Sequence, residues 1–142
     1  MGLDMYLFKS RIVDGLPLWL YDPSDIEKMS AELHEKLKPY EVEQGTISKW
    51  KSYSEEIAYW RKAYPVCEWF RNRLEHNDDG AYYEVTEDDL EDLLEHTEDR
   101  LLETSDPDER RELEHTVDVI GNILNGGVVD WEKDVVLYTE SW

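Results

Sequence analysis

Two acidic segments with leucine stripes, between Thr86 and Gly126, constrain the fold more than any other part of the chain. In each segment apolar residues recur every three or four positions, which is typical of an amphipathic helix that buries one face. Thr86 is suited to cap the first helix, Pro107 to begin the second, and Gly126 to end it. The pattern predicts a helical hairpin that turns near residue 105. Its inward residues are expected to be Leu90, Leu93, Leu94, Leu101 and Leu102 on the first helix, and Leu113, Val117, Ile120, Ile123 and Leu124 on the second.

Strands are predicted at both ends of the chain. Residues 3–8 and residues 134–141 are mostly apolar and contain aromatic or β-branched side chains. Strands at the two ends of one domain can pair with each other in a single sheet. Turns are expected at Asp14-Gly15 and residues 77–80, and short strands at residues 17–21 and 81–85.

Two more helices are predicted in the first half of the chain. The first is expected over residues 24–38, with Ser24 and Glu27 at capping-box spacing. The second is expected over residues 52–74 as a helix that is apolar on most sides and therefore buried. Pro65 interrupts this second helix, so a kink or a break is expected there.

Together these elements predict an α+β fold for a single domain over residues 1–142. About four helices are expected to pack on a small sheet formed by the N- and C-terminal strands, with the acidic helical hairpin in the helical layer. Residues 40–51 are expected to form a loop. A chain of 142 residues can fold without disulfides, and its one cysteine, Cys67, is expected to pack in the core.

The negative charge is concentrated near the hairpin. Residues 75–118 carry 19 acidic and 3 basic side chains, whereas residues 1–74 carry 12 acidic and 11 basic ones, and the whole chain has a formal charge of -20. Such a chain repels nucleic acids and anionic membranes and attracts basic proteins. The sequence shows neither a membrane-spanning stretch nor a signal pattern, so we expect a cytoplasmic protein.

The carboxylates of the hairpin are the strongest candidate for a binding site. Two adjacent helices can present carboxylates at spacings comparable to those of duplex phosphates, so a protein that holds DNA through Lys and Arg could bind this surface instead. The expected partner is a basic host protein, with no direct binding to nucleic acid or membrane. The alternative is a solvated helical surface without a partner. The residues predicted to bind the partner are Glu87, Asp88, Glu91, Asp92, Glu95, Glu98, Asp99, Asp108, Glu109 and Glu112.

No motif in the chain predicts catalysis. The sequence contains no phosphate-binding glycine loop, no nucleophile elbow and no zinc-binding histidine motif, so we expect neither a cofactor nor a metal. His96 and His115 are nearly level in the predicted hairpin, and Glu112 and His115 have the spacing used in carboxylate di-metal sites. Helical geometry turns both histidines towards water, however, which favours a solvated face over a metal site.

A basic and aromatic stretch precedes the hairpin. Residues 49–73 contain six basic and seven aromatic side chains, a composition that can bind single-stranded nucleic acid. Because the stretch neighbours the strongly acidic segment, its cations are expected to pair with the acidic helices instead.

Three short motifs resemble a family of proteins from tailed phages and prophages. They are the opening Met1–Leu7 (Met-Gly-Leu-Asp-Met-Tyr-Leu), the segment Tyr59–Ala63 (Tyr-Trp-Arg-Lys-Ala) and the end Ser141-Trp142. Family members continue after the second motif with Asn, Ala, Ile and His, whereas residues 64–67 are here Tyr, Pro, Val and Cys. The resemblance implies a phage or mobile-element context and no particular reaction.

These observations support three functions. The leading one is a non-enzymatic inhibitor of a host nucleic-acid-binding defence complex, of the anti-CRISPR kind, which acts through the acidic hairpin. The second is a small ligand-binding protein or enzyme with an anion pocket, for which a structural ion pair of Asp4 with Arg61 or Lys62 is the simpler alternative. The third is a homodimeric structural or assembly protein joined by exposed aromatic residues. The residues predicted for the anion pocket are Asp4, Tyr6, Trp60, Arg61 and Lys62.

Overall fold

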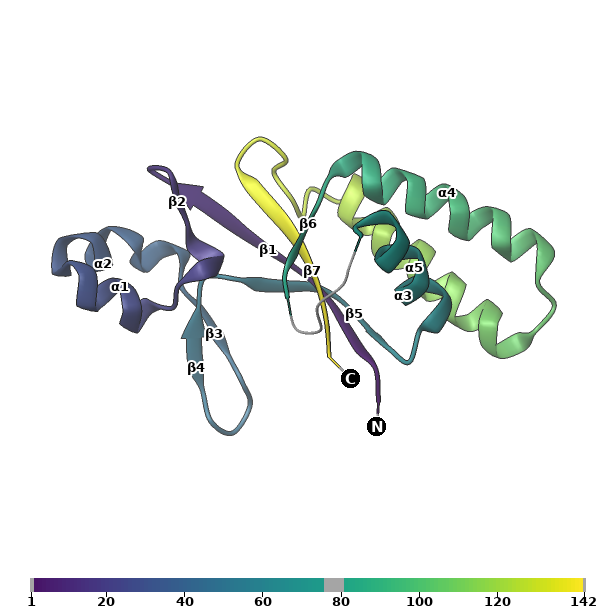
Figure 1. Cartoon of the computed structure of the whole chain (residues 1–142), viewed down its shortest axis with the longest axis horizontal. Helices are drawn as coiled ribbons and strands as arrows, with labels where there is room; N and C mark the ends of the chain where they lie inside the picture. The colour runs from purple at the N-terminus through teal and green to yellow at the C-terminus, as the bar shows by residue number, and fades with distance from the viewer. Residues whose placement is uncertain (1, 76–80, 142) are drawn as a thin grey trace.

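The computed structural model describes residues 2–75 and 81–141. Its centre is an antiparallel sheet built around β1 (Asp4–Val13), which pairs with β5 (Glu55–Arg61) along one edge and with β7 (Asp134–Ser141) along the other. The two ends of the chain are therefore neighbouring strands, as Figure 1 shows. Two short strands complete the sheet: β2 (Leu16–Pro17) pairs with the end of β1, and β6 (Tyr83–Val85) pairs with β7.

Three helices pack against one face of this sheet (Figure 1): α3 (Tyr64–Arg73), α4 (Glu87–Glu103) and α5 (Pro107–Asn125). α4 and α5 form the hairpin and lie side by side. Met5 and Leu7 of β1 are fully buried under the helices, because alternate residues of a strand face the same side. This shared core fixes the helical layer on the sheet.

A smaller lobe lies at the other end of the sheet (Figure 1). It has a core of its own, formed by Leu18, Ile26, Leu37 and Tyr53. Its hairpin turns at Gly45, where φ is 87° and a Cβ atom would lie 2.4 Å from the Ser48 carbonyl oxygen. The elements of the lobe are α1 (Pro23–Met29), α2 (Ala31–Leu37), the hairpin of β3 (Val42–Gln44) and β4 (Trp50–Ser52), and two 3-10 turns, η1 (Leu18–Leu20) and η2 (Lys38–Tyr40).

The α+β class and the helical hairpin are confirmed. The Thr86 hydroxyl accepts a hydrogen bond from the Asp89 amide (3.1 Å), and the Asp89 carboxylate accepts one from the Thr86 amide (2.9 Å), so α4 begins where the sequence predicts. α5 begins at Pro107 and is followed by Gly126, also as predicted. The last strand has the predicted bounds.

The prediction of the apolar stripe is wrong for one residue. Leu102 is 88 % exposed, because it lies one position further round α4 than Leu101 and is turned away from the core. Thr97 and Thr116, which the apolar pattern leaves out, are buried instead. Each threonine hydroxyl donates to the carbonyl four residues earlier in its own helix, which satisfies it without water.

The predicted helix over residues 52–74 is wrong in its first half. Residues 55–61 form β5, and the helix begins only at Tyr64. Ala58 and Trp60 are buried while Tyr59 between them is exposed, so the period in this segment is two. Pro65 stands in the first turn of α3, where its missing amide costs no hydrogen bond. The predicted break thus marks the boundary between a strand and a helix.

Four further expectations are wrong in the smaller lobe. The helix predicted over residues 24–38 is divided at Ser30, which has an extended backbone and caps α2 by accepting a hydrogen bond from the Leu33 amide. Asp22, and not Ser24, caps α1. The loop predicted at residues 40–51 contains the β3–β4 hairpin, and residues 18–20 of the predicted strand form a 3-10 turn. The turn predicted at residues 77–80 lies outside the described residues.

Candidate functional site

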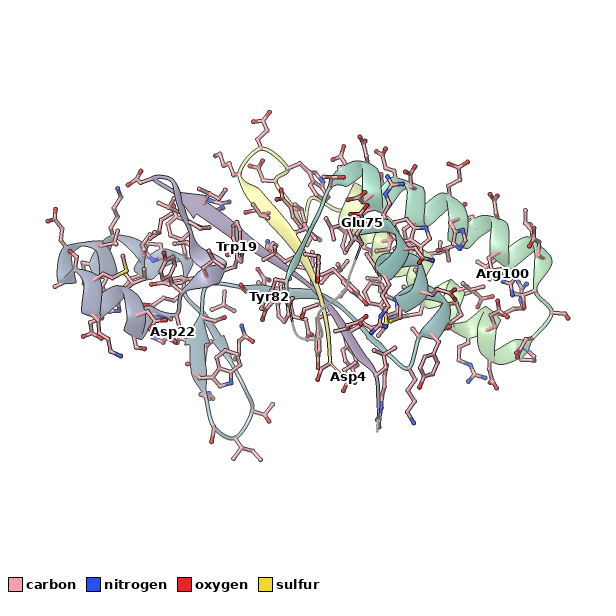
Figure 2. The ribbon with its side chains drawn as sticks, in the orientation of Figure 1. Asp4, Trp19, Asp22, Glu75, Tyr82 and Arg100 are labelled. Atoms are coloured by element: carbon pink, nitrogen blue, oxygen red, sulfur yellow. The ribbon has the colours of Figure 1, made fainter. Side chains whose placement is uncertain are left out.

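The ten carboxylates predicted to bind a partner lie on α4 and α5. Eight of them are exposed, and oxygen-tipped side chains project from the outer side of α4 in Figure 2. The other two, Glu109 and Glu112, are partly buried. The acidic surface is therefore more continuous along α4 than along α5.

Cations of the same chain neutralise part of this surface. Arg73 of α3 donates to Asp89 (2.7 Å) and to Asp92 (2.6 Å). Arg100 of α4 donates to Glu109 across the hairpin (2.6 Å), which holds the pKa of Glu109 below its usual value. These carboxylates already have partners, so they are less suited to a second protein than those that remain unpaired.

Four carboxylates on one side of α4 have no partner in the part of the chain that the structure describes. Glu91, Glu95, Glu98 and Asp99 surround a shallow hollow of about 240 Å³, and none of them forms an ion pair with another described residue. Four like charges that are close together and open to solvent attract cations. Within residues 2–75 and 81–141, no group of three or more histidine, cysteine or carboxylate side chains is arranged to hold a metal ion.

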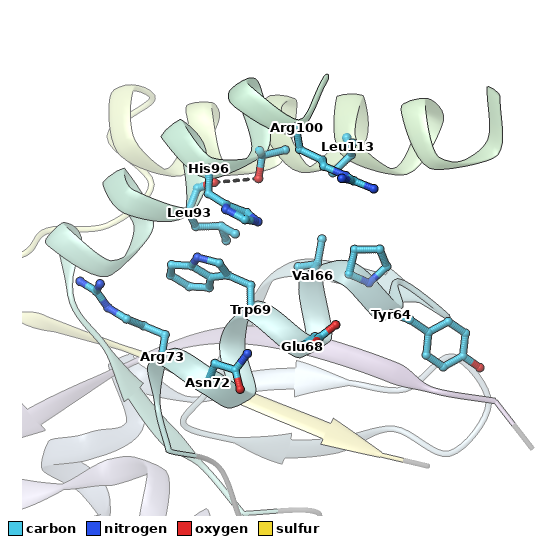
Figure 3. A pocket seen from close by; sticks show the side chains of 12 residues that line it. Tyr64, Val66, Glu68, Trp69, Asn72, Arg73, Leu93, His96, Arg100 and Leu113 are labelled. Carbon is cyan, nitrogen blue, oxygen red and sulfur yellow. Dashed lines mark hydrogen bonds between the residues drawn. The ribbon is translucent and has the colours of Figure 1, made fainter. Parts of the chain in front are cut away.

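A larger hollow lies on the opposite side of α4, between α3 and the hairpin. This groove has a volume of about 710 Å³, and its apolar lining includes Val66 and Trp69 of α3, Leu93 of α4 and Leu113 of α5. Figure 3 shows the Trp69 indole lying along the groove, with His96 reaching towards it from α4. His96 is exposed, as its helical position predicts, and it also borders this groove.

Glu112 differs from the other carboxylates of the hairpin. Its side chain is half-buried on α5, and no described cation pairs with it. Burial, and then the charge of Glu109, raise the pKa of Glu112 to about 7. At neutral pH Glu112 is therefore only partly charged, which makes it a poor contact for a basic partner.

Replacing Glu112 by glutamine is expected to stabilise the fold above pH 7. The pKa of Glu112 is higher in the folded chain than in the unfolded one, so its ionisation lowers stability as the pH rises from about 4.5 to about 7. Because solvent screens a half-buried group, we expect a gain of about 1 kcal/mol at pH 8 and none at acidic pH, where both forms are uncharged. Thermal unfolding of both proteins across this pH range measures the difference. An equal gain at every pH would show that the charge of Glu112 is not its cause.

The residues of the predicted anion pocket lie on two faces of the sheet. Asp4 of β1 is opposite Arg61 of β5, but its carboxylate accepts a hydrogen bond from the Tyr59 hydroxyl (2.5 Å). Arg61 and Lys62 are exposed, and neither of these described residues forms the expected ion pair with Asp4. Trp60 is on the other face, 2 % exposed among core residues. The structure therefore brings Asp4 and Arg61 together and separates both from Trp60.

A row of aromatic rings runs across the face of the sheet that is opposite the helices. Tyr6 stacks on Phe8 (5.7 Å between ring centroids) and contacts Tyr59 (5.2 Å), and Phe8 contacts Tyr82 (6.2 Å). Tyr59 and Tyr82 are 39 % and 51 % exposed. The homodimer hypothesis stays a prediction, and this row is the surface to which it applies.

Sequence reasoning missed a buried ion pair on β7. Glu140 is 1 % exposed, and its carboxylate accepts hydrogen bonds from the Tyr138 hydroxyl (2.5 Å), the Cys67 thiol (2.9 Å) and Arg71 Nε (2.7 Å). Cys67 is buried, as predicted. Burial, and then the neighbouring carboxylate, raise the pKa of Cys67 to about 11, so it remains an unreactive thiol. This cluster ties the C-terminal strand to α3.

The predicted pairing of residues 49–73 with the acidic helices is confirmed only in part. Arg73 binds α4, but Arg71 binds Glu140 of β7. Lys49 and Lys51 pair with Glu43 and Glu41 in the smaller lobe.

Fold and surface together define an acidic α+β domain with a charged helix face on one side of α4 and an apolar groove on the other. Comparisons with protein-family models, with curated proteins and with solved structures gave no match. The resemblance to phage and prophage proteins thus stays a prediction. Among the described helices, none has both the length and the apolar content to cross a bilayer.

Proposed function

We propose that this chain is a non-enzymatic binding protein whose acidic hairpin binds a basic, nucleic-acid-binding protein and competes with the nucleic acid for it. The observation that carries the proposal is the side of α4 on which Glu91, Glu95, Glu98 and Asp99 are exposed and form no ion pair with any residue that the structure describes. In the phage or mobile-element context that the sequence resembles, the partner is a host defence complex and the protein is its inhibitor.

The structure of α4 supports this role. The helix has 17 residues and packs along α5, so the backbone positions from which its carboxylates project are fixed before binding. Carboxylates one turn apart are separated by about 5.4 Å along the helix axis. A row of basic side chains that follows a nucleic-acid backbone can bind such a row, and salt weakens the complex because its contacts are charged.

Replacing Glu91, Glu95, Glu98 and Asp99 together by lysine is expected to abolish partner binding. The charges that attract the partner become charges that repel it, and we expect a loss of at least about 100-fold in affinity. The measurement is a pull-down from host lysate with stepwise salt elution, followed by titration of the recovered protein. The wild-type chain should retain a basic, nucleic-acid-binding protein that is released at moderate salt.

A matched control changes the net charge by the same amount at four positions outside the hairpin. Glu27, Glu32, Glu56 and Glu132 are exposed, lie outside the hairpin and form no ion pair with a described residue. Their replacement by lysine should leave the complex intact. Retention of the same partner by the α4 variant, or equal loss in both variants, would contradict a specific role for α4. Circular dichroism of each variant confirms that it is folded.

A further inference from the structure

We propose that the groove between α3 and α4 takes the apolar side of an amphipathic, basic helix of the partner. This inference rests on the proposed function, because it states how the basic partner is held. The acidic side of α4 accounts for charge attraction only. The groove adds a contact that depends on the order of apolar and basic residues in the partner.

The floor and wall of the groove are apolar. Val66, Leu93 and Leu113 line it from three different helices, and each is at most 2 % exposed. Trp69 is only partly buried and offers an indole to whatever enters. A hollow of about 710 Å³ has room for several side chains, and binding pockets are commonly lined by apolar and aromatic residues with a few polar groups.

The charge around the groove selects a basic occupant. The two cations on its rim are already bound to carboxylates: Arg73 to Asp89 and Asp92, and Arg100 to Glu109. On the α3 side, the exposed Glu68 forms no ion pair with a described residue.

On the α4 side of the groove, Asp99 is three residues after His96 and therefore lies beside it on the helix surface. It too is unpaired among the described residues. Glu68 on the lining of the groove and Asp99 on its α4 border, between the groove and the acidic hollow, thus each offer a carboxylate that no described cation pairs with.

An amphipathic helix fits this arrangement. Its apolar residues, spaced at three and four positions, enter the groove between two helices, and lysine or arginine residues on its flanks reach Glu68 on one side and Asp99 on the other. An acidic or neutral peptide would leave these carboxylates unmatched. A small aromatic molecule would fill the space near Trp69 without using either carboxylate.

Two synthetic peptides of equal composition test the inference. The first, of roughly 18 residues, carries leucine at helical spacing and lysine elsewhere, and the second has the same residues in an order without an apolar side. The wild-type protein is expected to bind the first at least about tenfold more tightly than the second, because only the first buries its leucines. Isothermal titration calorimetry measures both. Equal affinity for the two peptides would overturn the inference.

A substitution that fills the groove provides the second test. His96 is exposed, so His96→Trp places an indole in the groove with little expected effect on folding, and it should remove the preference for the amphipathic peptide. Asn122→Trp, at an exposed position of α5 outside the lining of the groove, should keep the preference. A preference that survives in His96→Trp would overturn the inference.

The two proposals fail differently. A variant with Glu91→Lys, Glu95→Lys and Glu98→Lys keeps both carboxylates of the groove, Glu68 and Asp99, and should weaken both peptides. Unchanged binding of both peptides to it would contradict the proposed function instead of the groove. Indole is a probe for the remaining alternative. A rise in unfolding temperature with indole, combined with no preference between the peptides, would assign the groove to a small molecule and overturn the inference.

Discussion

Replacing Arg71 by alanine is expected to lower the free energy of unfolding by about 3–5 kcal/mol. The side chain of Glu140 is 0 % exposed, and the Arg71 guanidinium is the cation that binds it, through Nε at 2.7 Å and through a second nitrogen. Without the arginine the carboxylate stays buried and loses this cation, while the hydroxyl of Tyr138 and the thiol of Cys67 still donate to it. An uncompensated buried charge is among the most destabilising features that one substitution can create.

Two further variants separate this effect from the loss of an arginine in general. Arg111→Ala removes a side chain that is 79 % exposed and 3.7 Å from Asp108, and it should cost no more than about 0.5 kcal/mol. The double change Arg71→Met with Glu140→Leu should recover most of the loss, because it removes both charges and leaves an apolar contact. Urea unfolding of the four proteins gives the comparison. A loss below about 1 kcal/mol in Arg71→Ala would contradict the burial of Glu140 as a charged group.

The hairpin could be predicted from the sequence because its determinants are local. The cap at Thr86, the proline at position 107 and the leucine spacing all act within a few residues of one another. The strand over residues 55–61 could not be predicted in this way. Ile57 and Trp60 suit a helix as well as a strand, and the open edge of β1, about 50 residues earlier in the chain, decides between them.

The acidic side of α4 and the groove also differ in how far local sequence determines them. The carboxylates of α4 are visible in the sequence, because helical spacing alone places them away from the leucines. The groove depends on how far α3 stands from the hairpin, which packing in three dimensions determines. Trp69 was predicted only as part of the helix over residues 52–74, and nothing near it in sequence indicates that Leu93 and Leu113 lie across from it.

Glu140 had a sequence signal that composition obscured. It alternates with Val136 and Tyr138 on the terminal strand, so the period of two places its side chain on the core side of the sheet. Among 35 acidic residues it did not stand out. A carboxylate in register with core residues indicates a buried ion pair, and the matching cation then has to come from an element packed on that face, here α3.

α4 links the two proposed contacts, because Glu91, Glu95 and Glu98 lie on the side away from the groove and Asp99 lies between them and His96 of the groove lining. Arg73 binds Asp89 and Asp92 of this helix and so connects α3 to it at one end of the groove. A partner that enters the groove therefore meets Asp99, at the edge of the carboxylate surface of the helix that forms one wall of the groove. This arrangement lets charge guide a basic partner to the molecule and lets apolar contacts determine which partner stays.

Replacing Trp60 by alanine is expected to lower the free energy of unfolding by about 3–5 kcal/mol. The Trp60 side chain is 2 % exposed, donates from Nε1 to the Thr116 hydroxyl (3.0 Å) and meets the Phe70 ring edge-on (6.0 Å between centroids). It thus joins β5 to both α5 and α3, and its loss leaves a cavity that the surrounding elements cannot close. Trp60→Phe keeps a ring and removes the hydrogen bond, so it should cost less, about 1–2 kcal/mol.

Trp50→Ala is the matched control, because Trp50 is 55 % exposed on the β3–β4 hairpin and its loss should change stability by about 0.5 kcal/mol or less. Denaturant unfolding of the three variants and the wild-type chain distinguishes a structural role of Trp60 from the ligand-binding role that the sequence also allowed. If Trp60 stabilises the core, the free energy of unfolding should be lowest in Trp60→Ala, intermediate in Trp60→Phe and highest in the wild-type chain. Unchanged stability in Trp60→Ala would contradict its place in the core, and Trp60 would again be a candidate for ligand binding. The expected order would remove Trp60 from the predicted anion pocket, in which Asp4 and Arg61 would remain as the pair that face each other.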